Sequence, residues 1–266
     1  ETFTLLVPNV KGGATILPAK GQNNLLSLAQ TPKAAELYAS GQISPEDYQY
    51  LAQFPQYFGD QPMTNGPVYV GAFIFMLFLI GCVIVKWMIQ WAILGVTLLT
   101  VMLSWGHNMM WLTDLFIDYF PLYNKFRTVS SILVVAEFTI PLLAMLALNR
   151  ILTEPDVLKR NMKLIFITLG AGAAVCLFIA LFPGIFRVFS EQEQQQYINS
   201  GVAQQVPSLF AAVATVRESL ISADAWRSLL VIAAGTVVLF LFAAEKIKIA
   251  ATATMLVVVT LFDLYT

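Results

Sequence analysis

Long apolar runs, separated by polar segments, dominate the pattern of this chain. The clearest runs are residues 67–85 and 164–182, and neither contains a charged side chain. A helix of about 20 apolar residues crosses the hydrocarbon core of a bilayer. Because lipid offers the backbone no hydrogen bonds, each crossing segment must be a helix that satisfies its own backbone groups. The pattern therefore predicts an all-α, polytopic integral membrane protein.

Six membrane spans are expected from the lengths of the apolar runs. Short turns join the first span to the second and the fifth to the sixth, and a basic loop joins the third to the fourth. The connection after the second span is longer and rich in aromatic residues. The expected spans are residues 67–85, 87–104, 129–149, 163–183, 227–244 and 248–264.

These spans group into two membrane units with polar segments around them. Residues 1–66 are expected to be an extracytoplasmic, partly helical segment. Residues 67–149 are expected to form a three-helix unit whose outer loop, 105–128, is re-entrant or interfacial. Residues 150–266 are expected to form a second three-helix unit with an outer amphipathic insert at 184–226.

Polar residues mark helices outside the apolar runs. In the first segment, Thr31-Pro32 and Ser44-Pro45 each pair an N-cap residue with a proline at the first helical position. Gly41 is a natural stop for the first of these helices.

The insert 184–226 is too polar to span a membrane and is expected to hold two helices. Ser190 and Glu193 have the spacing of a capping box, which starts a short helix. Residues 207–221 form the second helix, which we interpret as a packing lid over the spans because it lacks a strongly basic face. Leu209, Val213, Val216 and Leu220 recur at helical spacing, with Ser208, Arg217 and Ser219 elsewhere on the wheel.

Charge sets the expected orientation. The short turns carry a high density of lysine and arginine, whereas the long segments spread a similar number over many more residues. Because cytoplasmic loops are enriched in these residues, we expect the short turns in the cytoplasm and the long segments outside. The cations of the short turns are Lys86, Arg150, Lys159, Arg160, Lys163, Lys246 and Lys248.

Composition supports the membrane class and excludes a nucleic-acid partner. Hydrophobic residues make up 58% of the chain and charged residues only 12%, about half the charged share of a typical soluble protein. A net charge of −1 does not provide the basic surface that a nucleic-acid partner needs. Cys82 and Cys176 fall inside apolar runs, so we interpret both as small buried side chains.

One ionisable residue, Glu137, lies in the middle of the third expected span, four residues before Pro141. A carboxylate at membrane depth is costly, so it should face protein or water and have a partner. Proline removes one backbone hydrogen bond and bends a helix. The two residues predict either a cavity lined by an acidic group or a protonated Glu137 bonded to a neighbouring helix.

The connection 105–128 is the densest polar stretch. It holds His107, the only histidine, next to Asn108, and two carboxylates, Asp114 and Asp118, four residues apart. These carboxylates share one helical face and could bind a divalent cation or act on an acceptor; the alternative is a solvated pair. One histidine does not make a metal site, so no metal ligands and no cofactor are assigned.

Lys125 and Arg127 come just before the third span, opposite to the basic turns. Cations beside a helix N-terminus are not favoured by its dipole. An anion held by both side chains and the free backbone N–H groups would resolve the conflict, and a membrane lipid phosphate is the obvious one. Alternatively, both side chains extend to lipid headgroups.

Several motifs in residues 1–150 resemble those of one family. They are ETFTLLVPN at 1–9 with Gly12-Gly13, GDQP at 59–62, GPVYVG at 66–71, SWGHN at 104–108 and PLYNKFR at 121–127. Through them the chain resembles the large bacterial membrane proteins called YfhO-like, in their Bacteroidetes-type branch.

The resemblance implies relatedness to GT-C glycosyltransferases, which take a sugar from a polyprenyl-phosphate donor at the outer face of the bacterial cytoplasmic (inner) membrane. It also implies that the chain is an internal piece of a longer polypeptide. The catalytic acid of GT-C enzymes generally lies in the first outer loop, which would precede Glu1. Lys125 and Arg127 match the family motif and are expected to bind the donor phosphate, and Asp60, Asp114 and Asp118 are further candidates for the acid.

Three functions remain as expectations. The first is part of a GT-C-like membrane glycosyltransferase. The second is a non-catalytic membrane scaffold or complex subunit that docks a partner through its outer helices. The third is a transporter that couples proton movement to Glu137, and the lack of a repeated half in the sequence disfavours it.

Overall fold

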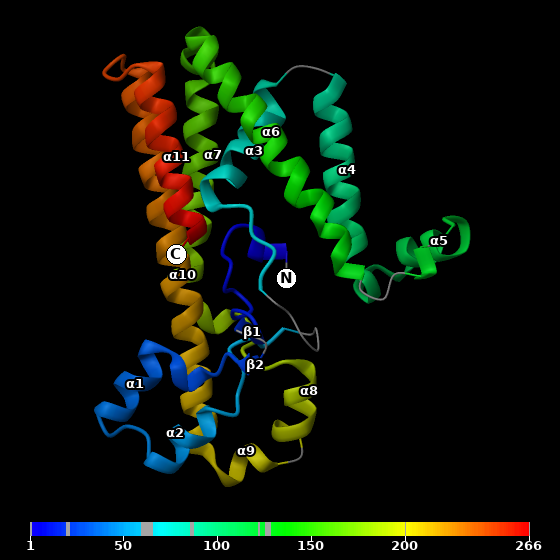
Figure 1. Cartoon of the computed structure of the whole chain (residues 1–266), viewed down its shortest axis with the longest axis vertical. Helices are drawn as coiled ribbons and strands as arrows, with labels where there is room; N and C mark the ends of the chain where they lie inside the picture. Colours follow the sequence, from blue (N-terminus) through cyan, green and yellow to red (C-terminus); the bar gives the residue numbers. More distant parts are fainter. Residues whose placement is uncertain are drawn as a thin grey trace. The chain divides into compact units, whose positions relative to one another are not determined.

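The computed structural model describes residues 2–19, 22–59, 66–85, 88–121, 123–125, 129–199 and 201–265. Helices dominate, and the strands β1 (Ile16–Ala19) and β2 (Gln22–Leu25) pair as an antiparallel hairpin (Figure 1).

The chain divides into two compact units. The first unit contains Phe3–Tyr69 and Ala174–Leu229, and the second contains Val70–Ala173 and Leu230–Thr266. This division differs from the two three-helix units expected from the sequence. The reason is that two long helices, α7 (Pro155–Leu181) and α10 (Pro207–Ala243), each contribute residues to both units.

Two short helices of the first unit begin where the sequence predicts. Thr31 Oγ1 accepts a hydrogen bond from the Ala34 N–H at 3.3 Å at the start of α1 (Pro32–Ala39). Ser44 Oγ accepts one from the Asp47 N–H at 3.0 Å at the start of α2 (Pro45–Leu51). Gly41 has a φ of 71°, a left-handed conformation that ends α1 as predicted.

The core of the first unit forms where α1, α2 and the short helix η2 (Leu28–Gln30) pack on the N-terminal part of α10 (Figure 1). The α10 residues with predicted helical spacing lie in this core, so this face packs on α1, α2 and η2, whereas its expected role as a lid over the spans stays a prediction. Burying each leucine contributes about 1.5–3 kcal/mol. The buried residues are Leu28, Ala34, Leu37, Ile43, Leu51, Leu209, Ala212, Val213 and Val216.

The predicted lid helix, 207–221, and the predicted fifth span, 227–244, are one helix of 37 residues rather than two. No glycine or proline stands between them to break the helix. The polar residues at the junction have partners instead. Arg227 lies 3.1 Å from Asp224, which also accepts a 2.7 Å hydrogen bond from the Asn9 N–H.

The second unit is built around α3 (Ala72–Ile84), which contacts α6 (Leu133–Thr153) and α11 (Ile249–Tyr265). Close approach depends on small residues. A Cβ on Gly81 would meet Leu143 at 3.0 Å, and one on Gly172 of α7 would meet Met76. The glycine at 172 therefore permits a close approach of α7 to the Met76 side chain of α3. The helix α4 (Met88–Ser104) packs on α6, where the hydroxyls of Thr97 and Thr139 are 2.7 Å apart.

In the part of the chain that the structure describes, three helices, α6, α7 and α10, are long and apolar enough to cross a membrane, and they mark the chain as a membrane protein. A fourth span is present if α4 is taken together with the segment Gly106–Tyr119, which is bent from it by 114°. The structure does not confirm all six expected spans, because the α3 helix has only 13 residues and the α11 helix only 17. At 1.5 Å per residue, α3 covers about 20 Å of a core about 30 Å thick. Gly71, with a φ of 96°, precedes the α3 helix, which begins at Ala72.

Candidate functional site

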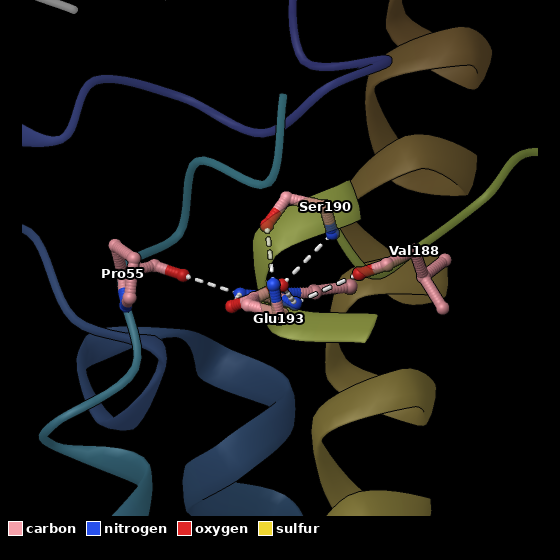
Figure 2. Close-up of polar contacts among 5 residues, drawn as sticks. Pro55, Val188, Ser190 and Glu193 are labelled. Carbon is pink, nitrogen blue, oxygen red and sulfur yellow. Dashed lines mark hydrogen bonds and ion pairs between the residues drawn. The ribbon is translucent and has the colours of Figure 1, made fainter. Parts of the chain in front are cut away.

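A buried arginine organises the polar contacts of the first unit. The Arg217 side chain on α10 is 0% exposed. Its Nη1 and Nη2 atoms donate to the two carboxylate oxygens of Glu193, each at 2.8 Å. Nη1 also donates to the Val188 carbonyl at 2.8 Å, and Nη2 donates to the Pro55 carbonyl at 3.2 Å. Figure 2 shows Pro55 on one stretch of the chain and both Val188 and Glu193 on another.

Glu193 has a second role at the start of α8 (Glu191–Glu193). Its Oε2 accepts from the Ser190 N–H at 3.0 Å, and Ser190 Oγ accepts from the Glu193 N–H at 3.2 Å (Figure 2). This is the capping box that the sequence predicts. One carboxylate therefore fixes both a helix start and the Arg217 guanidinium group.

Aromatic rings enclose the same arginine. The guanidinium carbon lies 5.2 Å from the centre of the Phe58 ring and 5.6 Å from the centre of the Phe189 ring. Both distances are within the range of a cation–π interaction. The charge of Arg217 is thus compensated by a carboxylate, two carbonyls and two rings, which explains how it can be fully buried.

A pocket of about 620 Å³ lies beside this cluster, within the first unit. Its lining includes Pro55, Ser190 and Glu193, so two of its walls are tied together through Arg217. Clefts of about 300–1,000 Å³ are typical of small-molecule sites. Five aromatic rings line the pocket: Tyr50, Phe54, Tyr57, Tyr197 and Phe210.

Three of these rings support one another. The ring centres of Phe54, Tyr197 and Phe210 are separated by 5.7–6.0 Å in each pairing. Tyr197 belongs to the π-helical turn η7 (Gln194–Ile198), which directly follows α8. Such turns are rare and occur frequently at functional sites.

The residues proposed from the sequence lie elsewhere, in the second unit, and are mostly exposed. His107 and Asn108 are exposed on the short helix η3 (Gly106–Met109), and Asp114 and Asp118 are exposed on α5 (Met110–Tyr119). Across the part of the chain that the structure describes, no three His, Cys, Asp or Glu side chains are grouped closely enough to hold a metal ion.

The proposed phosphate site is described only in part. Lys125 is exposed at the end of the short helix η4 (Tyr123–Lys125), where burial raises the pKa of the neighbouring Tyr123 hydroxyl. Arg127 lies outside the described residues, and so does Asp60.

Glu137 is exposed on α6, which runs on through Pro141, and a cavity lined by its carboxylate stays a prediction. Sequence reasoning instead missed the buried carboxylate of Asp263 on α11. This side chain is 2% exposed and accepts a 2.8 Å hydrogen bond from the Ala72 N–H at the start of α3. A carboxylate inside the last apolar run is the signal that could have found it.

The aromatic pocket was also missed from the sequence. Its walls come from Thr15 and from residues 50–59, 190–197 and 206–210, and only packing brings them together. Comparison of the chain with protein-family models, with characterised proteins and with solved structures gives no match.

Proposed function

We propose that this chain is part of a GT-C-like glycosyltransferase that uses a polyprenyl-phosphate-linked sugar at the outer face of the bacterial cytoplasmic membrane. The observation that carries the proposal is the position of Lys125. It is exposed in the short segment between the bent pair of α4 and α5 and the apolar helix α6. A cation at the end of an apolar helix can hold a phosphate group while a prenyl chain lies along apolar side chains.

Lys125 and Arg127 bind the donor phosphate in this proposal, as the resemblance of the motif at 121–127 implies. Transfer also needs a residue that acts as the acid–base group. Asp60, Asp114 and Asp118 are the candidates within this chain, and the exposure of Asp114 and Asp118 on α5 leaves both accessible to an acceptor.

The test is sugar transfer by the full-length protein carrying Arg127→Ala or Lys125→Ala. Each hydrogen bond to a charged group is worth about 1.5–3 kcal/mol, so each variant should lose about tenfold to a hundredfold in turnover. Expression in the membrane should be unchanged. Lys246→Ala is the matched control, because Lys246 is an exposed cation in the turn after α10. Unchanged turnover in both variants would remove these residues from the mechanism.

A non-catalytic scaffold is the second candidate. The observation that favours it is the hydrophobic core of the first unit, which gives the protein a folded module in addition to its apolar helices. The full-length sequence discriminates between the two. An acidic residue in a first outer loop supports the transferase, and its absence supports the scaffold. Proton transport through Glu137 remains a third and weaker proposal.

A further inference from the structure

We infer that the aromatic pocket of the first unit is a binding site for a neutral saccharide. The pocket lies wholly outside the Lys125 segment and its ligand needs no phosphate. The inference therefore stands whether or not the chain takes part in sugar transfer.

The lining has the two surfaces that a sugar ring needs. A sugar presents apolar C–H faces, which pack on aromatic rings, and the pocket supplies Tyr50, Phe54 and Tyr197. A sugar also presents hydroxyls, which both donate and accept. The amides of Gln53 and Gln192, which are exposed on the pocket lining, can do the same.

Charge in the pocket favours a neutral ligand. Among the described residues that line it, none is a lysine, arginine or histidine, so these residues offer no counter-charge to a phosphate or carboxylate. Glu193 is the lining carboxylate, and both of its oxygens are held by Arg217 at 2.8 Å. A cationic ligand would therefore compete with a buried ion pair.

The pocket is formed before any ligand arrives. Arg217 bonds to Pro55 on one wall and to Glu193 on another, so the walls are held at a fixed distance (Figure 2). A site that needs no ordering on binding loses less affinity to conformational entropy. Arg217 is a positioning residue in this account, because it is fully buried behind the lining.

A proline-rich peptide is the competing ligand, because such peptides also dock on aromatic grooves. Its proline residues lack N–H groups and offer only carbonyl acceptors. With such a peptide, the NH₂ groups of the glutamine side chains would find acceptors, but their carbonyl oxygens would find no donor. Sugar hydroxyls can both accept from the NH₂ groups and donate to the carbonyl oxygens. The lining therefore favours the saccharide, and the peptide becomes an outcome of the test.

The experiment is saturation-transfer NMR on the purified chain in a detergent whose headgroup is not a sugar, such as lauryldimethylamine oxide. Sugar-based detergents are avoided because their headgroups would fill the site. The probes are cellohexaose, maltohexaose and chitohexaose, with a polyproline peptide for comparison. We expect saturation transfer to at least one oligosaccharide and none to the peptide.

Two variants test the location. Tyr50→Ala removes a ring that is 50% exposed, and Gln192→Ala removes an exposed amide, so neither change should disturb folding. Each should weaken oligosaccharide binding about fivefold. The control is Tyr38→Ala, an exposed tyrosine on α1 that does not line the pocket, and it should bind like the unmodified chain. Transfer to none of the oligosaccharides, transfer to the peptide alone, or undiminished binding by both variants would overturn the proposal.

Discussion

One guanidinium group joins α10 to two stretches of the first unit that are distant from it in sequence. Arg217 donates to Pro55, Val188 and Glu193, and no local pattern around Arg217 indicates these partners. On the helical wheel of residues 207–221, Arg217 falls outside the stripe of apolar residues. The structure nevertheless buries its side chain completely. The capping box of Ser190 and Glu193 is different, because it depends only on residues three apart, and the sequence predicted it correctly.

Removing Glu193 should be strongly destabilising. In Glu193→Ala, the Arg217 guanidinium would stay buried without its counter-charge, and breaking a buried pair in this way typically costs about 3–5 kcal/mol. The helix start at Ser190 would lose its cap as well. We expect a clear drop in the melting temperature of the purified protein, measured in detergent by circular dichroism.

Glu245→Gln is the matched control for that measurement. Glu245 lies 2.5 Å from Lys159, but both side chains are largely exposed. The hydrogen bond from Lys159, with its charge, holds the pKa of Glu245 below the ordinary value. Any stabilisation from this pair is therefore present at neutral pH and lost as the pH falls through the lowered pKa. Because exposed pairs contribute little, we expect no measurable change. Equal melting temperatures for Glu193→Ala and Glu245→Gln would show that the Arg217 contacts are unimportant.

Helix starts in this chain are predictable from the sequence, whereas helix lengths are not. Thr31 and Ser44 begin α1 and α2 because their side chains bond to the backbone three residues on. The length of α10 depends instead on tertiary partners. Asp224 would break the apolar pattern of a membrane helix, but the Asn9 N–H and Arg227 compensate it, so the helix continues.

Gly235→Ala should disrupt the packing of α10 on α3. A Cβ at Gly235 would lie 2.3 Å from atoms of the Phe73 ring, which is rigid and buried. The ring or a helix must therefore move, and overpacking of this kind typically costs about 1–3 kcal/mol. The measurement is the melting temperature in detergent, where we expect a decrease.

Gly95→Ala tests whether that effect comes from packing rather than from the glycine itself. A Cβ at Gly95 of α4 would meet nothing within 4 Å. Alanine also favours a helix over glycine by about 0.5–1 kcal/mol. We expect an unchanged or higher melting temperature, and a loss as large as that of Gly235→Ala would contradict the packing explanation.

Both units of the molecule expose large apolar side chains. In the first unit these include Leu181 at 57% and Ile185 at 63% exposed. In the second they include Val134, Phe138 and Met145 on α6, each more than 60% exposed. Such a surface is a liability in water and is suited to lipid. Composition predicted this class correctly, because a soluble fold could not bury so many apolar residues.

The number of spans and the aromatic pocket could not be predicted in the same way. The number of spans depends on where the helix within each apolar run begins and ends. The α3 helix, for example, begins only after Gly71, which has a left-handed backbone conformation. The pocket depends on contacts between segments as far apart as Thr15 and Phe210. Both are consequences of tertiary packing, which hydropathy does not record.

The most direct test of the account is the side of the membrane on which the 105–128 connection lies. Cysteines introduced at the exposed positions Asp114 and Arg160, in a chain carrying Cys82→Ala and Cys176→Ala, can be labelled on intact cells with a membrane-impermeant maleimide. The account predicts that Asp114→Cys is labelled from outside, and that Arg160→Cys is labelled only after permeabilisation. The reverse result would invert the orientation and remove the proposed donor site from the outer face.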